Sequence, residues 1–142
     1  MDTAGDINGD GYADIVIGAP DYDSGQTDEG KAFVWHGSSN GVNNGINGNP
    51  TNAAWSNEVD QDGAFFGLSV STAGDVNGDG FSDVIIGAPY YTNGQDAEGG
   101  SWVYLGSSTG LKISSATHDE GNQAQARFGT SVALAGDVNG DG

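Results

Sequence analysis

Hydrophobic residues along this chain occur in short runs separated by clusters of Gly, Asn, Asp and Pro. Apolar residues alternate with small or polar ones over 68–72 and 130–134, β-branched runs occupy 14–17 and 83–86, and aromatic and β-branched residues fill 32–35 and 101–105. Short runs of this composition between turn-forming residues predict β-strands. Residues 53–59 and 114–117 are weaker candidates for one further strand in each half of the chain.

These runs belong to a unit that repeats along the chain. Residues 6–20 match residues 75–89, and a third start at Asp137 stops at Gly142. Two other blocks repeat as well, 30–41 with 99–110 and 66–74 with 128–136. The first unit has additional residues in the Asn- and Gly-rich stretch around 42–51, which predicts a longer loop there.

Four short strands in a unit of roughly 60–70 residues indicate an all-β fold made of four-stranded antiparallel β-propeller blades. A β-sandwich built from the same strands is the alternative. The first unit covers 1–74 and lacks most of its own first strand. The second covers 75–136 and takes 66–72 as its first strand, and 128–142 holds the first strand and a truncated loop of a following blade.

Charge restricts the partners of the chain. It has 3 Lys and Arg against 20 Asp and Glu, a net charge of −17 at pH 7. Three basic residues cannot form the positive patch that nucleic acids require, and an anionic membrane surface is disfavoured for the same reason. The sequence has no Cys, no apolar run long enough to span a bilayer, and no visible signal peptide. We therefore expect neither nucleic-acid binding nor membrane insertion.

One motif combines acidic residues with a fixed spacing. Asp6, Asn8, Asp10 and Asp14 stand at positions 1, 3, 5 and 9 of a loop, and Asp75, Asn77, Asp79 and Asp83 repeat the pattern. Gly11 and Gly80 at position 6 permit a sharp turn, and the position-7 carbonyls of Tyr12 and Phe81 offer a further oxygen. A cage of hard oxygen ligands favours Ca²⁺ over Zn²⁺ and over Mg²⁺.

The surroundings of the motif exclude a helix–loop–helix calcium site. Such a site needs a bidentate Glu at position 12 and flanking helices, whereas Ile17 and Ile86 stand there and a strand follows. A solvated turn without metal is the simpler reading of one copy, but two full copies between strand signals argue against it. The third loop retains Asp137, Asn139 and Asp141 and lacks positions 7 and 9, so we expect no tight site there unless another chain completes it.

With these motifs, the chain resembles the FG-GAP repeats of the integrin α-subunit propeller and its bacterial relatives. The matching residues are Phe66-Gly67 and Phe128-Gly129, Gly18-Ala19-Pro20 and Gly87-Ala88-Pro89, and the Asp-rich loop. The resemblance implies blades of a seven-bladed propeller in complete members, calcium between the first two strands of a blade, and adhesion or recognition outside the cell or at its surface. The ligands that it implies are Asp6, Asn8, Asp10, the Tyr12 carbonyl and Asp14, with Asp75, Asn77, Asp79, the Phe81 carbonyl and Asp83 in the second loop.

About two blades cannot close a ring, because propellers use about four to eight. The chain is therefore expected either to belong to a longer array of blades or to assemble with itself. Two, three or four identical copies would give rings of four, six or eight blades, and we favour the trimeric ring of six.

Two other functions remain as alternatives to a non-catalytic calcium-binding scaffold. An enzyme would draw on His36 or His118 and on the carboxylate pairs Asp60/Asp62 and Asp119/Glu120, yet packing or a rim contact explains His36 better, and a solvated polar loop explains the others. A glycan- or protein-binding face would use Tyr22, Tyr90, Tyr91, Trp55 and Trp102. The competing reading is that Trp35 and Trp102 pack inside the blades.

Overall fold

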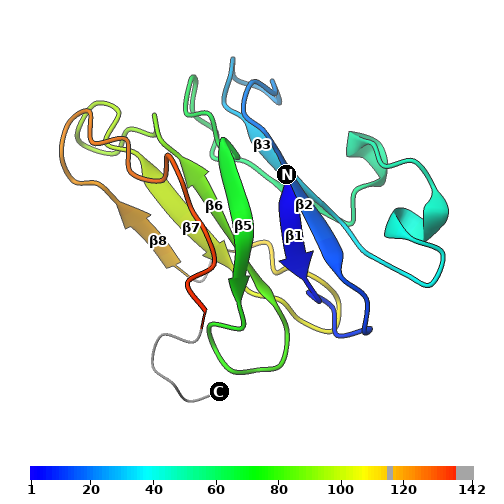
Figure 1. Ribbon diagram of the computed structural model, residues 1–142. Helices are drawn as coiled ribbons and strands as arrows, with labels where there is room; N and C mark the ends of the chain where they lie inside the picture. Colours follow the sequence, from blue (N-terminus) through cyan, green and yellow to red (C-terminus); the bar gives the residue numbers. More distant parts are fainter. Residues whose placement is uncertain (115–116, 137–142) are drawn as a thin grey trace.

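The computed structural model describes residues 1–114 and 117–136, which form two four-stranded antiparallel β-sheets (Figure 1). The first sheet contains β1 (Asp2–Gly5), β2 (Asp14–Ala19), β3 (Lys31–Trp35) and β4 (Trp55–Asn57). The second contains β5 (Ser69–Gly74), β6 (Asp83–Ala88), β7 (Gly100–Tyr104) and β8 (Thr117–Glu120). Each strand pairs with its neighbours in sequence, as in a propeller blade, and two sheets do not close a ring.

Strands β2 to β7 fall on the predicted runs, and β1 (Asp2–Gly5) is the short first strand that the first unit retains. Two predicted runs differ from the structure. The fourth strand of the second sheet lies at Thr117–Glu120, which overlaps the predicted range 114–117 at Thr117, and residues 115 and 116 of that range lie outside the described residues. The strand forms although its residues are polar, because it pairs with β7 through the backbone, Ser101 opposite Asp119. Residues 130–134 were expected to form a strand, and that prediction is wrong for this structure. A strand requires hydrogen bonds to a partner strand, and within the described residues the segment 130–134 has none; the isolated bridge of Gly99 with Phe128 lies just before it.

The segment after Phe128 nevertheless lies where a following blade would begin. The Gly67 carbonyl lies against Gly18 of the first sheet, and the Gly129 carbonyl lies against Gly87 of the second in the same way. Ser69 also donates a hydrogen bond to the Gly129 carbonyl at 2.7 Å. An added Cβ would approach these carbonyls to 1.8 Å at Gly18 and 2.0 Å at Gly87, so the Gly of each Gly-Ala-Pro turn permits close approach of the next segment.

The long loop of the first unit is ordered by contacts with Trp35. It contains two short 3₁₀ turns, η1 (Val42–Gly45) and η2 (Pro50–Asn52). Trp35 Nε1 donates to Asn52 Oδ1 at 3.0 Å, and Gly48 lies against the indole ring. The extra residues therefore cover an aromatic side chain at the rim of the first sheet.

Aromatic and β-branched side chains between the two sheets form the core. Phe66 is fully buried, and its ring meets the Trp102 ring edge-on with centroids 5.4 Å apart. Trp55 meets Tyr104 in the same manner at 4.9 Å. Edge-on pairs of this kind add to the stabilisation from buried apolar area. The described residues contain no helix with the length and hydropathy needed to cross a membrane.

Tyr104 places a polar group inside this core. Its hydroxyl accepts a hydrogen bond from Asn57 Nδ2 at 3.0 Å, and the side chain is 2% exposed. Burial raises the pKa of Tyr104 to about 12, from an ordinary value of 10.0. The neutral hydroxyl thus joins the second sheet to the last strand of the first.

We predict that Tyr104 makes the protein sensitive to alkali. In the unfolded chain Tyr104 loses its proton near pH 10, before the folded chain does, so the free energy of unfolding should fall as pH rises from about 10 to 12. The expected slope is up to about 1.4 kcal/mol per pH unit for one proton. Urea unfolding across this range should show a shallower slope in Tyr104→Phe, and an unchanged slope would contradict the assignment.

Candidate metal centre

The first Asp-rich loop joins β1 to β2, and its acidic side chains turn toward its own backbone. The Asp6 carboxylate accepts the amide hydrogens of Gly9 at 2.7 Å, Asp10 at 3.1 Å and Gly11 at 2.9 Å. Asn8 Oδ1 accepts from the Asp10 amide at 3.1 Å, and Asp10 Oδ1 from the Tyr12 amide at 2.9 Å. The oxygens at positions 1, 3 and 5 are thereby oriented by the loop itself.

Asp14, at position 9, is fully buried at the start of β2. Its Oδ2 accepts from the Ile7 amide at 2.9 Å, and its Oδ1 from the Gly37 amide at 2.8 Å. Burial raises the pKa of Asp14, and the hydrogen bonds from Gly37 and Ile7 oppose that rise. The carboxylate connects the start of the loop to the turn that follows β3.

The second loop repeats this geometry between β5 and β6. Asp75 accepts from the amides of Asp79 at 3.1 Å and Gly80 at 2.7 Å, and the hydrogen bond from Gly80 is the main reason that its pKa is lowered. Buried Asp83 accepts from Val76 and Gly106, both at 2.8 Å. Burial raises the pKa of Asp83, and the neighbouring negative charges of Asp79 and Asp75 raise it further.

The position-6 glycines have the conformation that the sequence predicts. Gly11 and Gly80 have φ of +87° and +89°, a left-handed conformation that disfavours any residue with a Cβ. No heavy atom lies within 4 Å of a Cβ built at either residue, so backbone conformation rather than lack of space requires glycine.

The first loop also contacts the second sheet. The Ser82 amide donates to the Asp6 carbonyl at 2.9 Å, and the Ser107 amide to the Ile7 carbonyl at 3.1 Å. The Phe81 ring covers Gly9, where an added Cβ would lie 2.7 Å from Phe81 Cε1. The first loop is therefore part of the contact between the two sheets.

The donor set of each loop suits a hard divalent cation. Each loop carries three carboxylates and one amide oxygen, with no basic side chain within 4.0 Å of a loop carboxylate in the described part of the chain. The structure does not bring the three carboxylates of either loop, Asp6, Asp10 and Asp14 or Asp75, Asp79 and Asp83, within 4.8 Å of one another, and both oxygens of Asp14 and of Asp83 accept backbone amides. Carboxylate and carbonyl oxygens are the ligands that Ca²⁺ prefers. Ligation by the Tyr12 and Phe81 carbonyls stays a prediction, and Asp137, Asn139 and Asp141 of the third loop lie outside the described residues.

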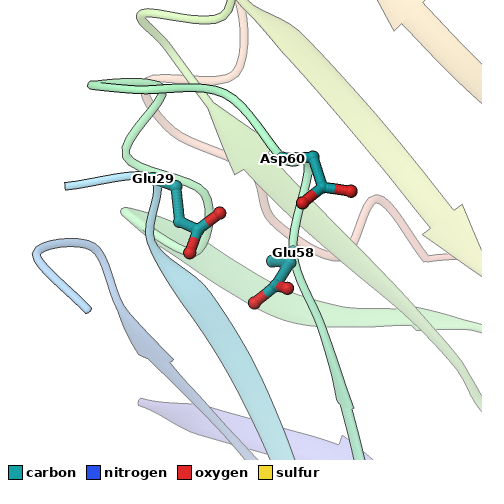
Figure 2. Close-up of side chains that lie close together, drawn as sticks. All are labelled: Glu29, Glu58 and Asp60. Atoms are coloured by element: carbon teal, nitrogen blue, oxygen red, sulfur yellow. The ribbon is translucent and has the colours of Figure 1, made fainter. Parts of the chain in front are cut away.

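The tightest acidic group in the structure is one that the sequence analysis missed. Glu29, Glu58 and Asp60 place one carboxylate oxygen each within 4.8 Å of the others, and no other trio of His, Cys, Asp or Glu does so within 1–114 and 117–136 (Figure 2). The signal available in the sequence was the repetition of Glu29-Gly30 as Glu98-Gly99 at the end of the same turn.

Two of the five aromatic residues proposed for ligand binding are buried, two are half-buried and one is exposed. Trp55 and Trp102 are 6% and 7% exposed and belong to the core, which favours the reading of Trp102 as a residue that packs inside the blade. Tyr22 meets the Phe33 ring edge-on, and Tyr91 meets Trp102 in the same way. Tyr90 is the exposed one, at 37%, and the Arg127 guanidinium lies 4.8 Å from its ring centre.

The two histidines occupy different environments. His36 Nδ1 lies 2.9 Å from Asn8 Nδ2, which makes His36 a neighbour of the first loop. His118 lies on β8 and not in a solvated loop, because its ring stacks on Trp102 with centroids 4.4 Å apart. The structure therefore gives His36 the rim contact that the sequence favours.

Comparisons with known proteins agree with this geometry. The FG-GAP repeat family matches the chain at residues 3–35 and 66–104. These ranges cover β1 to β3 and β5 to β7 with their loops. Integrin alpha-PS2 of Drosophila melanogaster is 36% identical over 96% of the chain, integrin alpha-6 of Gallus gallus 34% over 90%, and integrin alpha-7 of Mus musculus 32% over 96%. The chain spans only 10–11% of the length of these relatives. With two four-stranded sheets and two copies of the motif, this chain belongs to the FG-GAP repeat family.

Proposed function

We propose that this chain is a non-catalytic calcium-binding module of an integrin-like β-propeller, with an adhesion-type role outside the cell or at its surface. The observation that carries the proposal is the repetition of one loop geometry in both sheets, with four oxygen-bearing side chains in each. The integrin relatives support the adhesive setting. Extracellular calcium near millimolar concentration suits weak modular sites of this kind.

Calcium in the first loop would stabilise the contact between blades. Asp6 and Ile7 receive hydrogen bonds from Ser82 and Ser107 of the second sheet through their backbone carbonyls. A cation bound by the side chain of Asp6 would hold that backbone in place, so metal binding would contribute to folding. This is a structural use of the metal that needs no substrate.

A ligand-binding face and an enzyme are less well supported. The structure buries Trp55 and Trp102, which removes two of the five residues of the aromatic face. The imidazole of His36 contacts Asn8, and that of His118 stacks on Trp102. Neither histidine is arranged as a base beside a nucleophile.

We further propose that additional blades complete the ring, supplied by copies of this chain or by adjacent blades of a longer one. Phe66 is fully buried against Trp102 of the next sheet, whereas its repeat counterpart Phe128 is 43% exposed. Leu134 in the same segment is 50% exposed. A third sheet lying over this segment would bury both side chains, and a trimer would provide it in a ring of six blades.

Each intact loop should bind one calcium ion. Asp10→Asn and Asp79→Asn each remove one ligand charge, so each should weaken one site at least about tenfold in titration calorimetry with calcium chloride. Asp119→Asn, an exposed change of equal charge on β8, should leave both loop sites unchanged. Wild-type binding in both loop variants would refute the calcium assignment.

The exposed apolar side chains of Phe128 and Leu134 should drive the assembly. In sedimentation velocity with millimolar calcium, the wild-type chain should form a ring, with three copies favoured, and Phe128→Asp should remain a folded monomer. Ile46→Asp, at a residue 64% exposed in the long loop, is the control and should assemble normally. A wild-type chain that stays monomeric would rule out self-assembly, and normal assembly of Phe128→Asp would rule out this interface.

A further inference from the structure

Three carboxylates converge at the end of the first sheet that lies opposite the Asp-rich loop. Glu29 closes the turn between β2 and β3, and Glu58 and Asp60 follow β4. Strand β2 separates this group from the Asp-rich loop, because the loop precedes the strand and the turn follows it (Figure 1). Figure 2 shows the three carboxylate groups gathered around one point from two segments of the chain.

Glu29 is the unusual member of the group. The residue is 0% exposed, and its Oε1 accepts the backbone amides of Ser24 and Gln26. Its Oε2 is buried without any hydrogen-bond partner, and within the described residues no basic side chain lies within 4.0 Å of the carboxylate. Burying a carboxylate oxygen without a partner is unfavourable, and a cation held between Glu29 and the two neighbouring carboxylates would supply that partner.

We propose that Glu29, Glu58 and Asp60 bind a divalent cation, with Ca²⁺ as the best match, at a site separate from the Asp-rich loops. Calcium–oxygen distances of about 2.3–2.6 Å place two ligands of one ion up to about 5 Å apart. The three ligand atoms here lie within 4.8 Å of one another, which leaves room for such an ion between them.

Lys31 supplies part of the balancing charge without closing the site. Its ammonium lies 2.8 Å from Glu58 Oε2 and 3.0 Å from Ser24 Oγ. Glu58 keeps its other oxygen for a metal ion, and Glu29 and Asp60 make no ion pair with a described side chain. Three carboxylates and one ammonium leave a charge of about −2, which a divalent ion neutralises.

An ion at this point would fix the connection between the two sheets. Residues 58–66 lead from β4 toward β5, and the Phe66 amide donates to the Glu29 carbonyl at 2.8 Å. Gln61 exchanges two hydrogen bonds with the backbone of Thr92 in the second sheet, at 2.8 and 2.7 Å. Binding of Glu29 together with Glu58 and Asp60 would therefore join the turn of one blade to the segment that contacts the next.

The second sheet provides a natural comparison, because it has the same turn without the full acidic group. Glu98 is fully buried, its Oε1 accepts from Asn93 and Gln95, and its Oε2 has no partner. By strand register, Glu120 corresponds to Glu58, but Asn122 stands in place of Asp60. The Asn93 side-chain amide donates a hydrogen bond to the Glu120 carboxylate, and the His118 imidazole contacts the same carboxylate. We therefore assign the new site to the first sheet.

Asp60→Asn tests the proposal with little risk to folding. Asp60 is exposed with φ of +51°, and Asn122 occupies the equivalent position at φ +50°, so the variant copies a residue that the fold already contains. Native mass spectrometry in calcium should count one fewer ion per chain in Asp60→Asn and in Glu29→Gln than in the wild type. Glu98→Gln is the matched control for loss of a buried charge and should keep the wild-type number.

A second measurement locates the ion independently of its number. Crystals soaked in terbium chloride should show an anomalous peak in contact with Glu29 Oε2, which Asp60→Asn should abolish. An unchanged ion count in Asp60→Asn, or a wild-type crystal without a peak at Glu29, would overturn the proposal. A wrong calcium assignment for the Asp-rich loops can be told apart from a wrong assignment of this site. The loop sites are tested by Asp10→Asn and Asp79→Asn, and neither variant should remove the ion that depends on Asp60.

Discussion

A buried carboxylate at the start of the second strand of each sheet organises the structure around it. Asp14 receives the amides of Ile7 and Gly37, and Asp83 receives those of Val76 and Gly106. Each pair of bonds connects the Asp-rich loop to the turn that follows the third strand of the same sheet. Charge-assisted hydrogen bonds in a buried setting are strong, so the first three strands and the loop are held in one arrangement before any metal is considered.

This anchoring explains how a loop of nine residues can form part of a blade contact. The backbone around Asp6 and Ile7 is fixed, and it accepts hydrogen bonds from Ser82 and Ser107 of the next sheet. A flexible loop would lose conformational entropy on making such contacts. Because the loop is already organised by Asp14, the neighbouring sheet meets a surface that needs little further ordering.

Most of the fold could be predicted from the sequence, because each strand and turn motif occurs in two copies. The Gly-Ala-Pro turns, the position-6 glycines and the Asp spacing each impose a local geometry that short-range chemistry determines, and the structure has that geometry at Gly11 and Gly80. The polar residues of β8 beyond Thr117 were not predicted, because they carry no hydrophobic pattern and their pairing to β7 is decided by the backbone. The segment 130–134 has strand propensity but no described partner strand, and propensity alone does not make a strand.

The acidic group at Glu29 shows why a site assembled from distant segments escapes motif analysis. Glu58 and Asp60 come close to Glu29 only because β4 pairs with β3, and nothing in their spacing indicates that contact. The two ends of the blade also differ in how strictly they repeat. The Asp-rich loops are nearly identical in both sheets, whereas the opposite ends differ at Asp60 and Asn122 and at Lys31 and Gly100. Residues at the Asp-rich end keep the same loop geometry in both blades. Residues at the opposite end can differ between the two blades, so the connection from one blade to the next need not be the same each time.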